Sequence, residues 1–222
     1  WHEVPFLILN IIGLLLIIDW SIIPSMARTR DEQKFNQLKD SLLEVGQELF
    51  IGSSFNSVGL NDILKRSGVP KGSFYHYFAS KEDFALQVIE LYHKENYTAL
   101  AELLQDNSLN AYQQLKQFFQ NSIDHFDDVG YCQGCLMANL SQELADVNEN
   151  MRCKISQFST EMVELVSGCL ERIENNELNL GHLQSREAAQ VLMNSWTGAI
   201  MKMKLEKSRE PLDVYMKYFF AH

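Results

Sequence analysis

The chain has 222 residues, of which 46% are hydrophobic, and its formal net charge at pH 7 is -10. This length and apolar content suffice for one large domain or two small ones with a real core, and the absence of repeats and low-complexity tracts excludes a solenoid or a disordered chain. The acidity lies in the C-terminal part, because residues 83–222 hold eleven Lys/Arg and twenty Asp/Glu whereas residues 26–82 are nearly balanced. Glycine and proline are sparse and long polar–apolar periods dominate, which predicts an all-α protein.

The first 25 residues differ from the rest. Their apolar run VPFLILNIIGLLLII would form a helix of about 22 Å, short of a bilayer core of about 30 Å. The basic n-region and small-residue cleavage site of a secretory signal are missing. We expect residues 1–25 to be an upstream or added extension, with the native start at Met26. The alternatives are a membrane anchor or an extra helix packed on the body.

The next segment predicts a long helix from about Thr29 to Phe50. Its apolar positions recur at three- and four-residue steps: Phe35, Leu38, Leu42, Val45 and Leu49. The segment LNDILKRS, residues 60–67, predicts a short second helix. Gly59 suits its N-cap, Asp62 its third position and Gly68 the left-handed position after its end.

Two further helices follow. Pro70 fits the first turn of a short helix that ends near Phe78, and Ser80 fits the cap of a longer helix that reaches about Leu104. Two short helices joined by a tight glycine turn, with longer helices before and after, predict a helix-turn-helix.

Beyond residue 105 the pattern predicts helices at about 109–127, 134–145, 148–175, 184–206 and 211–221. The helices at 148–175 and 184–206 carry wide apolar stripes, with Phe158, Met162, Leu165, Val166 and Leu170 on one and Val191, Trp196 and Ile200 on the other. Such stripes suit helices that bury one side within the subunit and another against a second subunit. We therefore predict a DNA-binding domain at 26–79 and a regulatory and dimerisation domain at 80–222.

The helix at 70–78 is the candidate for chemistry. Helical spacing assigns Phe74 and Phe78 to the core, together with Val69 and Ile63. The outward side chains are donors suited to phosphate oxygens and base edges in a major groove: Lys71, Ser73, Tyr75, His76 and Tyr77. Gly72 lets the backbone approach a duplex, and Lys81 can meet a phosphate at a helix N-terminus. The alternative is a structural helix pair with solvated lysines.

The stretch VGLNDILKRSGVPKGSFYHYFASKEDF, residues 58–84, resembles the DNA-binding signature of the TetR family of bacterial transcriptional repressors. The resemblance implies an all-helical homodimer whose three N-terminal helices bind DNA and whose C-terminal bundle dimerises and holds an inducer. The residues that match DNA-touching positions are Lys71, Gly72, Tyr75, His76, Tyr77 and Lys81, with Ser73 among them. Gly59 stands where the family often has a phosphate-contacting threonine or serine, which puts that contact in doubt.

Three later segments, GCLMANLSQELAD, MRCKISQF and TGAIMKMKLEKSREPL, resemble a subgroup that includes the repressor of N-ethylmaleimide reductase and responds to electrophiles and oxidants. Cys135 matches the sensing cysteine of that subgroup. Independently, Cys135 follows Gly134 at a predicted helix start, where a thiolate is favoured, and Lys202 and Lys204 are candidate cations. Modification would enlarge this residue and shift the helices around it. The alternative is a small buried core residue.

Other residues leave alternatives open. The pair Cys132 and Cys135 has C-x-x-C spacing, which permits a disulfide, but no second ligand pair exists, so we predict no metal and no cofactor. An inducer pocket could be lined by Trp196, Met137, Met193 and Met201, which could equally be plain core. Four cysteines in a chain without an export signal indicate reduced thiols in the cytoplasm.

We therefore expect a cytoplasmic, dimeric repressor of double-stranded operator DNA, released by a small-molecule inducer or by an electrophile. We expect the protein to be positioned on the duplex by phosphate contacts from Lys71, Tyr75, Lys81 and the arm residues Arg28 and Arg30, and the bases to be read by Ser73 and His76. We expect the inducer or electrophile to be sensed by Cys135, Lys204, Trp196 and Met137. No nucleophile-elbow, Walker or Rossmann motif predicts an enzyme. The alternatives are a membrane-tethered sensor, an activator, and a regulator that answers an apolar ligand without cysteine chemistry.

Overall fold

The computed structural model describes residues 22–173, 178–180 and 182–220, with side chains from residue 32 onward. The chain divides into two compact units, residues 1–41 and 42–222. Within the described ranges all regular structure is helical, which confirms the predicted fold class. The helices are α2 (Ile22–Gly52), α3 (Leu60–Ser67), α4 (Lys71–Tyr77), α5 (Lys81–Leu103), α6 (Ala111–Asp128), α7 (Leu136–Leu144), α8 (Glu149–Leu170), α9 (Ser185–Glu206) and α10 (Glu210–Phe219).

Helix α2 begins at Ile22, earlier than the predicted Thr29. Pro24 lies in its first turn, where the missing N–H has no helical partner to lose. Phe35 and Leu38, the first two apolar positions of the predicted pattern, are 42% and 37% exposed, whereas Leu42 is fully buried. The described part of the first unit is a single helix.

The expectation for residues 1–25 falls mostly on residues 1–21, which lie outside the described part of the chain. Among the helices that the structure describes, none combines the length and apolarity needed to cross a bilayer.

The second unit contains the predicted helix-turn-helix. The Gly59 N–H donates to the Asp62 carboxylate at 2.8 Å at the start of α3. Gly68 ends that helix with φ 69°, in the left-handed region that glycine enters without a steric penalty. Pro70 is the N-cap of α4 and not part of its first turn, because its ψ of 143° is extended although its φ of −61° would suit a helix. The Ser80 hydroxyl accepts from the Asp83 N–H at 3.1 Å and caps α5 as predicted.

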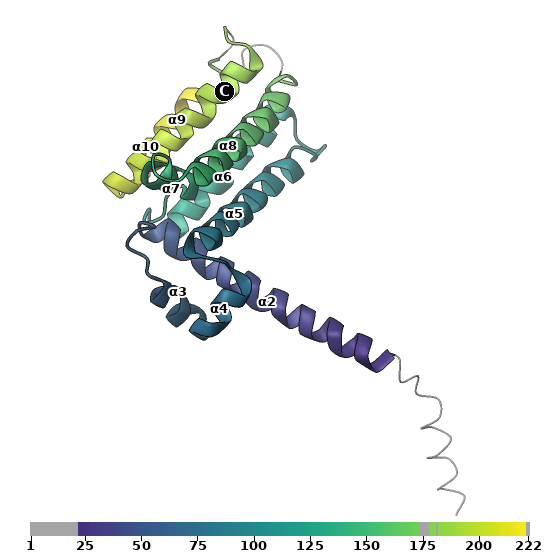
Figure 1. Ribbon diagram of the computed structural model, residues 1–222. Helices are drawn as coiled ribbons and strands as arrows, with labels where there is room; N and C mark the ends of the chain where they lie inside the picture. The colour runs from purple at the N-terminus through teal and green to yellow at the C-terminus, as the bar shows by residue number, and fades with distance from the viewer. Residues whose placement is uncertain (1–21, 174–177, 181, 221–222) are drawn as a thin grey trace, which may run out of the picture. The chain divides into compact units, whose positions relative to one another are not determined.

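Two buried clusters organise this unit. One joins the C-terminal part of α2, the helices α3 and α4 and the first half of α5 to α7 and the start of α8, and it includes Phe74, Phe84 and Leu140. The other fills the space between α6, α8, α9 and α10 around Phe119 and Trp196. Figure 1 shows α5, α6, α8, α9 and α10 running alongside one another, with α3 and α4 near the start of α5. Helix α7 therefore shares its core with the helix-turn-helix.

Candidate nucleic-acid interface and regulatory cavity

Helix α4 is anchored by one face and open on the other. The Phe74 ring is fully buried and lies 5.1 Å from the ring of Phe78 and 5.4 Å from that of Phe84. Tyr75 is 56% exposed and rests edge-on against Phe74, with ring centres 5.5 Å apart. The core assignment of Phe74 and Phe78 is thus confirmed, as are those of Val69 and Ile63.

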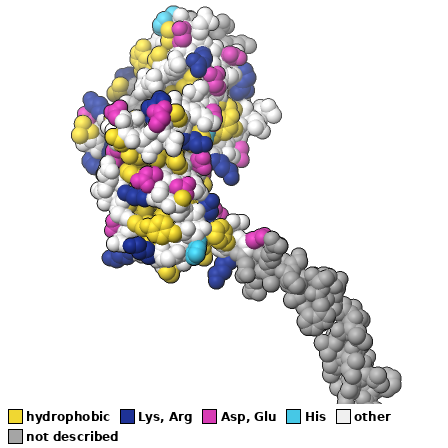
Figure 2. Space-filling view, in the orientation of Figure 1, with side chains coloured by type: hydrophobic (Ala, Val, Ile, Leu, Met, Phe, Trp, Pro, Cys, Tyr) yellow, Lys and Arg dark blue, Asp and Glu magenta, His cyan; other side chains and the backbone are white. Residues whose placement is uncertain are grey.

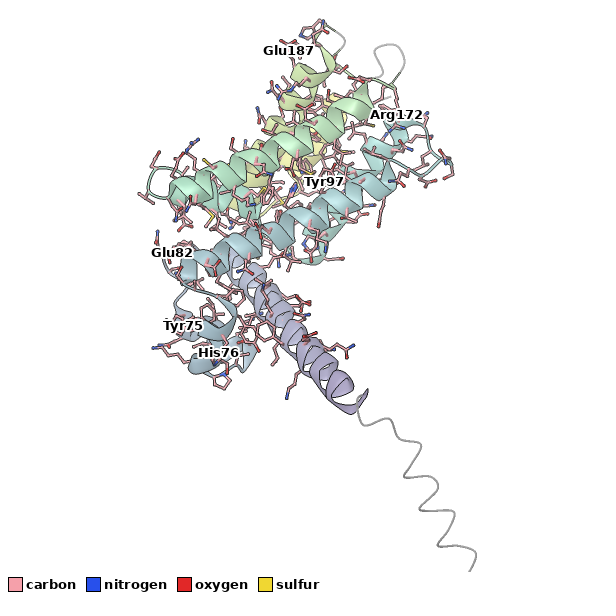
Figure 3. The ribbon with its side chains drawn as sticks, turned by 45° about the vertical axis from the view of Figure 1, so that its right-hand side comes forward. Tyr75, His76, Glu82, Tyr97, Arg172 and Glu187 are labelled. Carbon is pink, nitrogen blue, oxygen red and sulfur yellow. The ribbon has the colours of Figure 1, made fainter. Side chains whose placement is uncertain are left out.

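The open face carries the predicted polar set. Lys71, Gly72 and His76 are exposed, whereas Ser73 and Tyr77 are half-buried. Figure 3 places Tyr75 and His76 on the α3–α4 pair, at the same end as Glu82 and away from Arg172 and Glu187 of the bundle. Lys71 and His76 therefore present hydrogen-bond donors on the exposed side of α4, whose other side is buried in the core.

The charge of this end is mixed. In Figure 2, Lys and Arg side chains lie beside hydrophobic groups and a histidine over the α3–α4 end. Lys65 and Lys71 are exposed there. Arg66 pairs with Glu48 of α2 at 2.5 Å, so an acid from a separate helix also faces these cations. That pairing requires α2 and α3 to meet, which no local pattern encodes.

Lys81 is held by the loop between α2 and α3. Its ammonium donates to the Phe55 carbonyl at 2.5 Å and lies 4.0 Å from the centre of the Phe55 ring. Burial lowers the pKa of Lys81. An ammonium has three donors, so this contact leaves others for a further partner. The remaining predicted contacts, Arg28 and Arg30, lie on α2, but their side chains are outside the described residues.

A cavity of about 960 Å³ opens among the C-terminal part of α2 and helices α5 to α9. Its wall combines apolar groups with hydroxyl, amide and carboxylate groups. Trp196, Met137 and Met193 line it, together with Cys135. Trp196 also belongs to the buried core around Phe119. Met201 is not in its lining; it is 45% exposed, and its sulfur accepts from the Gln142 amide at 3.7 Å.

Cys135 is half-buried and is the N-cap of α7. Tyr92 of α5 reaches the same place, and burial, followed by the neighbouring Cys135 thiol, raises the pKa of Tyr92 well above its ordinary value. The phenol therefore stays protonated beside the thiol across the physiological range. No local pattern in the sequence indicates this contact, because it joins α5 to the start of α7.

Of the two candidate lysines, Lys204 comes close to this turn. A Cβ added at Gly134 would lie 3.2 Å from Lys204 Cδ and 3.8 Å from its Nζ, and the same ammonium donates to the Ile51 carbonyl at 3.4 Å. Lys202 is instead exposed and pairs with Glu206 one turn later at 3.3 Å. Side chains two positions apart on a helix point to different sides, so Lys202 and Lys204 of α9 face different directions.

The other cysteines have different surroundings. Cys132 is exposed and Cys169 is buried, where burial raises the pKa of the Cys169 thiol. Cys153 is exposed and donates to the Glu149 carboxylate at 3.2 Å, which raises the pKa of its thiol. The part of the chain that the structure describes holds no cluster of three His, Cys, Asp or Glu residues that could bind a metal ion.

An exposed basic and aromatic helix after a tight glycine turn, set on a helical bundle with a cavity, defines a helix-turn-helix transcription regulator. Residues 42–88 match the family described as "Bacterial regulatory proteins, tetR family", and residues 111–219 match "Tetracyclin repressor-like, C-terminal domain". The chain belongs to the TetR family of transcriptional regulators, which points to a regulator and not an enzyme.

Relatives agree with this assignment. The HTH-type transcriptional repressor NemR of Escherichia coli K12 is 34% identical over 79% of this chain and 88% of its own length. The HTH-type transcriptional repressor DhaR of a Mycobacterium species is 30% identical over 82% of this chain and 90% of its own length. The crystal structure of reduced E. coli NemR has a TM-score of 0.74 over 81% of this chain and 93% of that chain, at 34% identity. These findings confirm the likeness to the N-ethylmaleimide reductase repressor subgroup.

Proposed function

We propose that the protein is a homodimeric repressor that binds operator DNA through α4 and leaves it when the cavity accepts a small molecule or when the Cys135 thiol is modified. The observation that carries the proposal is the two-faced α4, whose Phe74 is fully buried while Tyr75 is 56% exposed. The names of the relatives support it, because NemR and DhaR are both HTH-type transcriptional repressors.

On the duplex, α4 enters the major groove. Lys71, Tyr75 and Tyr77 contact phosphates, Gly72 lets the backbone come close, and the unused donors of Lys81 face the same strand. Ser73 and His76 reach base edges. Arg28 and Arg30 act as an arm. Two copies of the rod meet half-sites about 34 Å apart or a multiple of that distance.

The second copy of the chain docks on α9. Val191 and Leu205, which are 39% and 82% exposed, lie fourteen residues apart, with the open Gly198 midway between them. Seven-residue spacing keeps these three positions on one face of a helix. An apolar stripe with a central glycine lets two helices approach closely, and this supports a dimer built on α9 and its neighbour α8.

Release starts at the cavity wall. Cys135 sits beside Tyr92 and one residue from the Gly134–Lys204 contact, so a group added to its sulfur has to displace neighbours in a half-buried space. The alternative, an apolar ligand without cysteine chemistry, is favoured by Trp196, Met137 and Met193 in the same lining.

The test is fluorescence anisotropy with DNA that flanks the gene of the protein, with and without N-ethylmaleimide. We expect Lys71→Ala and Tyr75→Ala to weaken binding at least tenfold, about 1.4 kcal/mol each. We expect Cys135→Ser to bind normally and resist release, while the matched variant Cys132→Ser responds like the wild type. Full affinity of both alanine variants in a folded protein would refute the DNA interface. Release unchanged in Cys135→Ser would remove the thiol and leave the apolar ligand.

A further inference from the structure

The loop between α2 and α3 is held by a side chain from α7. The Glu143 carboxylate accepts from the Phe55 N–H at 3.1 Å with one oxygen and from the Asn56 N–H at 3.2 Å with the other. The Asn56 amide adds a third donor at 3.4 Å. Hydrogen bonds to an ionised acceptor are stronger than neutral ones, and two consecutive N–H groups fix the direction of the loop.

Phe55 is also held from the side of α5. Lys81 donates a hydrogen bond to the Phe55 carbonyl and makes a cation–π contact with its ring, which lies 5.5 Å from the ring of Phe50. The residue is 5% exposed. One peptide in this loop is therefore clamped between an acid on α7 and a base on α5.

A second contact from α7 lies one turn earlier. The Asn139 amide donates to the Ile51 carbonyl at 3.4 Å, and Lys204 donates to the same carbonyl. Asn139 and Glu143 are four residues apart and share a face. That face holds both the end of α2 and the loop that leads to α3, which begins at Leu60.

The other end of α7 reaches the cavity. Cys135 caps this helix, and Met137, Ala138 and Ser141 line the cavity. Nine helical residues make a rod of about 13 Å. Leu136, Leu140 and Leu144 fix it in the core of the helix-turn-helix. Because packed helices shift as units of about 1–2 Å, a displacement at Cys135 reaches Glu143.

We infer that Glu143 is a positioning residue, which sets the α2–α3 loop for operator binding and ties that loop to the cavity through α7. The inference deepens the proposed function and rests on it. Its loop end rests on the proposed operator binding, and its cavity end rests on the proposed release. The role requires a carboxylate, because a glutamine offers one oxygen to the two N–H groups and turns an NH₂ donor toward the other.

The test compares wild type, Glu143→Gln and a matched control, Glu102→Gln, in the full-length chain. Glu102 is an exposed acid in the last turn of α5, at the opposite end of that helix from Lys81, so its variant makes the same charge change away from the loop and from the proposed dimer helices. Three quantities are measured: operator dissociation constant, the ratio of that constant with and without N-ethylmaleimide, and hydrogen exchange of the 53–59 peptide. Circular dichroism confirms folding, and Glu143→Asp, which keeps the charge on a shorter arm, serves if Glu143→Gln fails to fold.

We expect Glu143→Gln to weaken operator binding at least about fivefold, to speed exchange at Phe55 and Asn56, and to lower the release ratio at least about fivefold, within the usual range of coupling between sites. The control should match the wild type in all three. A purely structural role would weaken binding equally with and without the reagent and leave the ratio unchanged, which would overturn the link to the cavity. Affinity and loop exchange within twofold of the control would overturn the inference entirely. If the wild type is not released while Glu143→Gln still binds weakly, the proposed release fails and the positioning of the loop stands.

Discussion

The ammonium of Lys81 donates to the carbonyl of Phe55 at 2.5 Å and also lies over the ring of that residue. The lysine that the sequence pattern assigns to a DNA phosphate thus also connects α5 to the α2–α3 loop. Both roles use the same positive charge, but one affects the stability of the fold and the other affects the salt dependence of operator binding.

Lys81→Met keeps the aliphatic stem and removes the charge. We expect the free energy of unfolding to fall by about 1–3 kcal/mol, because the Phe55 carbonyl loses its partner. The proposed phosphate contact predicts in addition that the slope of log affinity against log salt falls by about 1. Thermal unfolding and a salt titration of operator binding measure the two effects.

Lys94→Met on the exposed side of α5 is the control for both. If Lys81→Met lowers the salt slope without loss of stability, Lys81 acts only as a DNA contact. If it loses stability with an unchanged salt slope, Lys81 acts only by holding the α2–α3 loop.

Gly46 of α2 packs directly against Phe84 and Val88 of α5. A Cβ at this position would lie 2.7 Å from Val88 Cγ2, and it would also meet the Phe84 ring. We expect Gly46→Ala to lower the free energy of unfolding by about 1–3 kcal/mol through overpacking. Urea denaturation is the measurement. Gly52→Ala is the control, since nothing lies within 4 Å of the added carbon. Equal stability of the two variants would contradict the close packing.

The proposed dimer face on α9 can be tested by charge. Replacing Val191 and Leu205 together by glutamate puts two like charges into each copy of an apolar stripe, so we expect a monomer in sedimentation velocity and at least tenfold weaker operator binding. Val147→Glu is matched, because Val147 is 78% exposed but lies between α7 and α8. A double variant that remains dimeric would move the interface away from this stripe.

We expect the Cys153 thiol to react with iodoacetamide more slowly than its solvent exposure suggests. The carboxylate of Glu149 raises the pKa of this thiol, so less thiolate is present near pH 8 than for an ordinary cysteine. Hydrogen bonds from Arg152 lower the pKa of Glu149 to about 2, which keeps the carboxylate ionised throughout a labelling assay. We expect Glu149→Gln to speed iodoacetamide labelling of Cys153 roughly two- to fivefold.

Peptide mass spectrometry reads each cysteine separately in that experiment. Cys132 is the internal control and should not change, and the buried Cys169 should stay unlabelled until the protein unfolds. An unchanged rate at Cys153 would show that Glu149 does not hold the thiol in solution.

Much of the helix-turn-helix could be predicted because its signals are local. Gly68 and Ser80 act through their own backbone or through a residue three positions away, and the period that buries Phe74 and Phe78 spans a single turn. Such signals depend on the residues themselves and not on where the chain goes next. The motif at residues 58–84 and its resemblance to the family could be recognised for the same reason, because the motif is continuous in the sequence.

The tertiary structure alone decided which residues meet across long separations. Glu143 reaches Phe55 over 88 positions, Lys204 reaches Ile51 over 153, and Arg66 finds Glu48 on a different helix. Helical period cannot choose between Lys202 and Lys204, nor predict that Phe35 stays exposed, because both depend on which element lies opposite. The sequence by itself thus determined the helices and the outward face of α4, through interactions within one or two turns. The cavity, the surroundings of Cys135 and the hold of α7 on the α2–α3 loop arise only when distant helices pack.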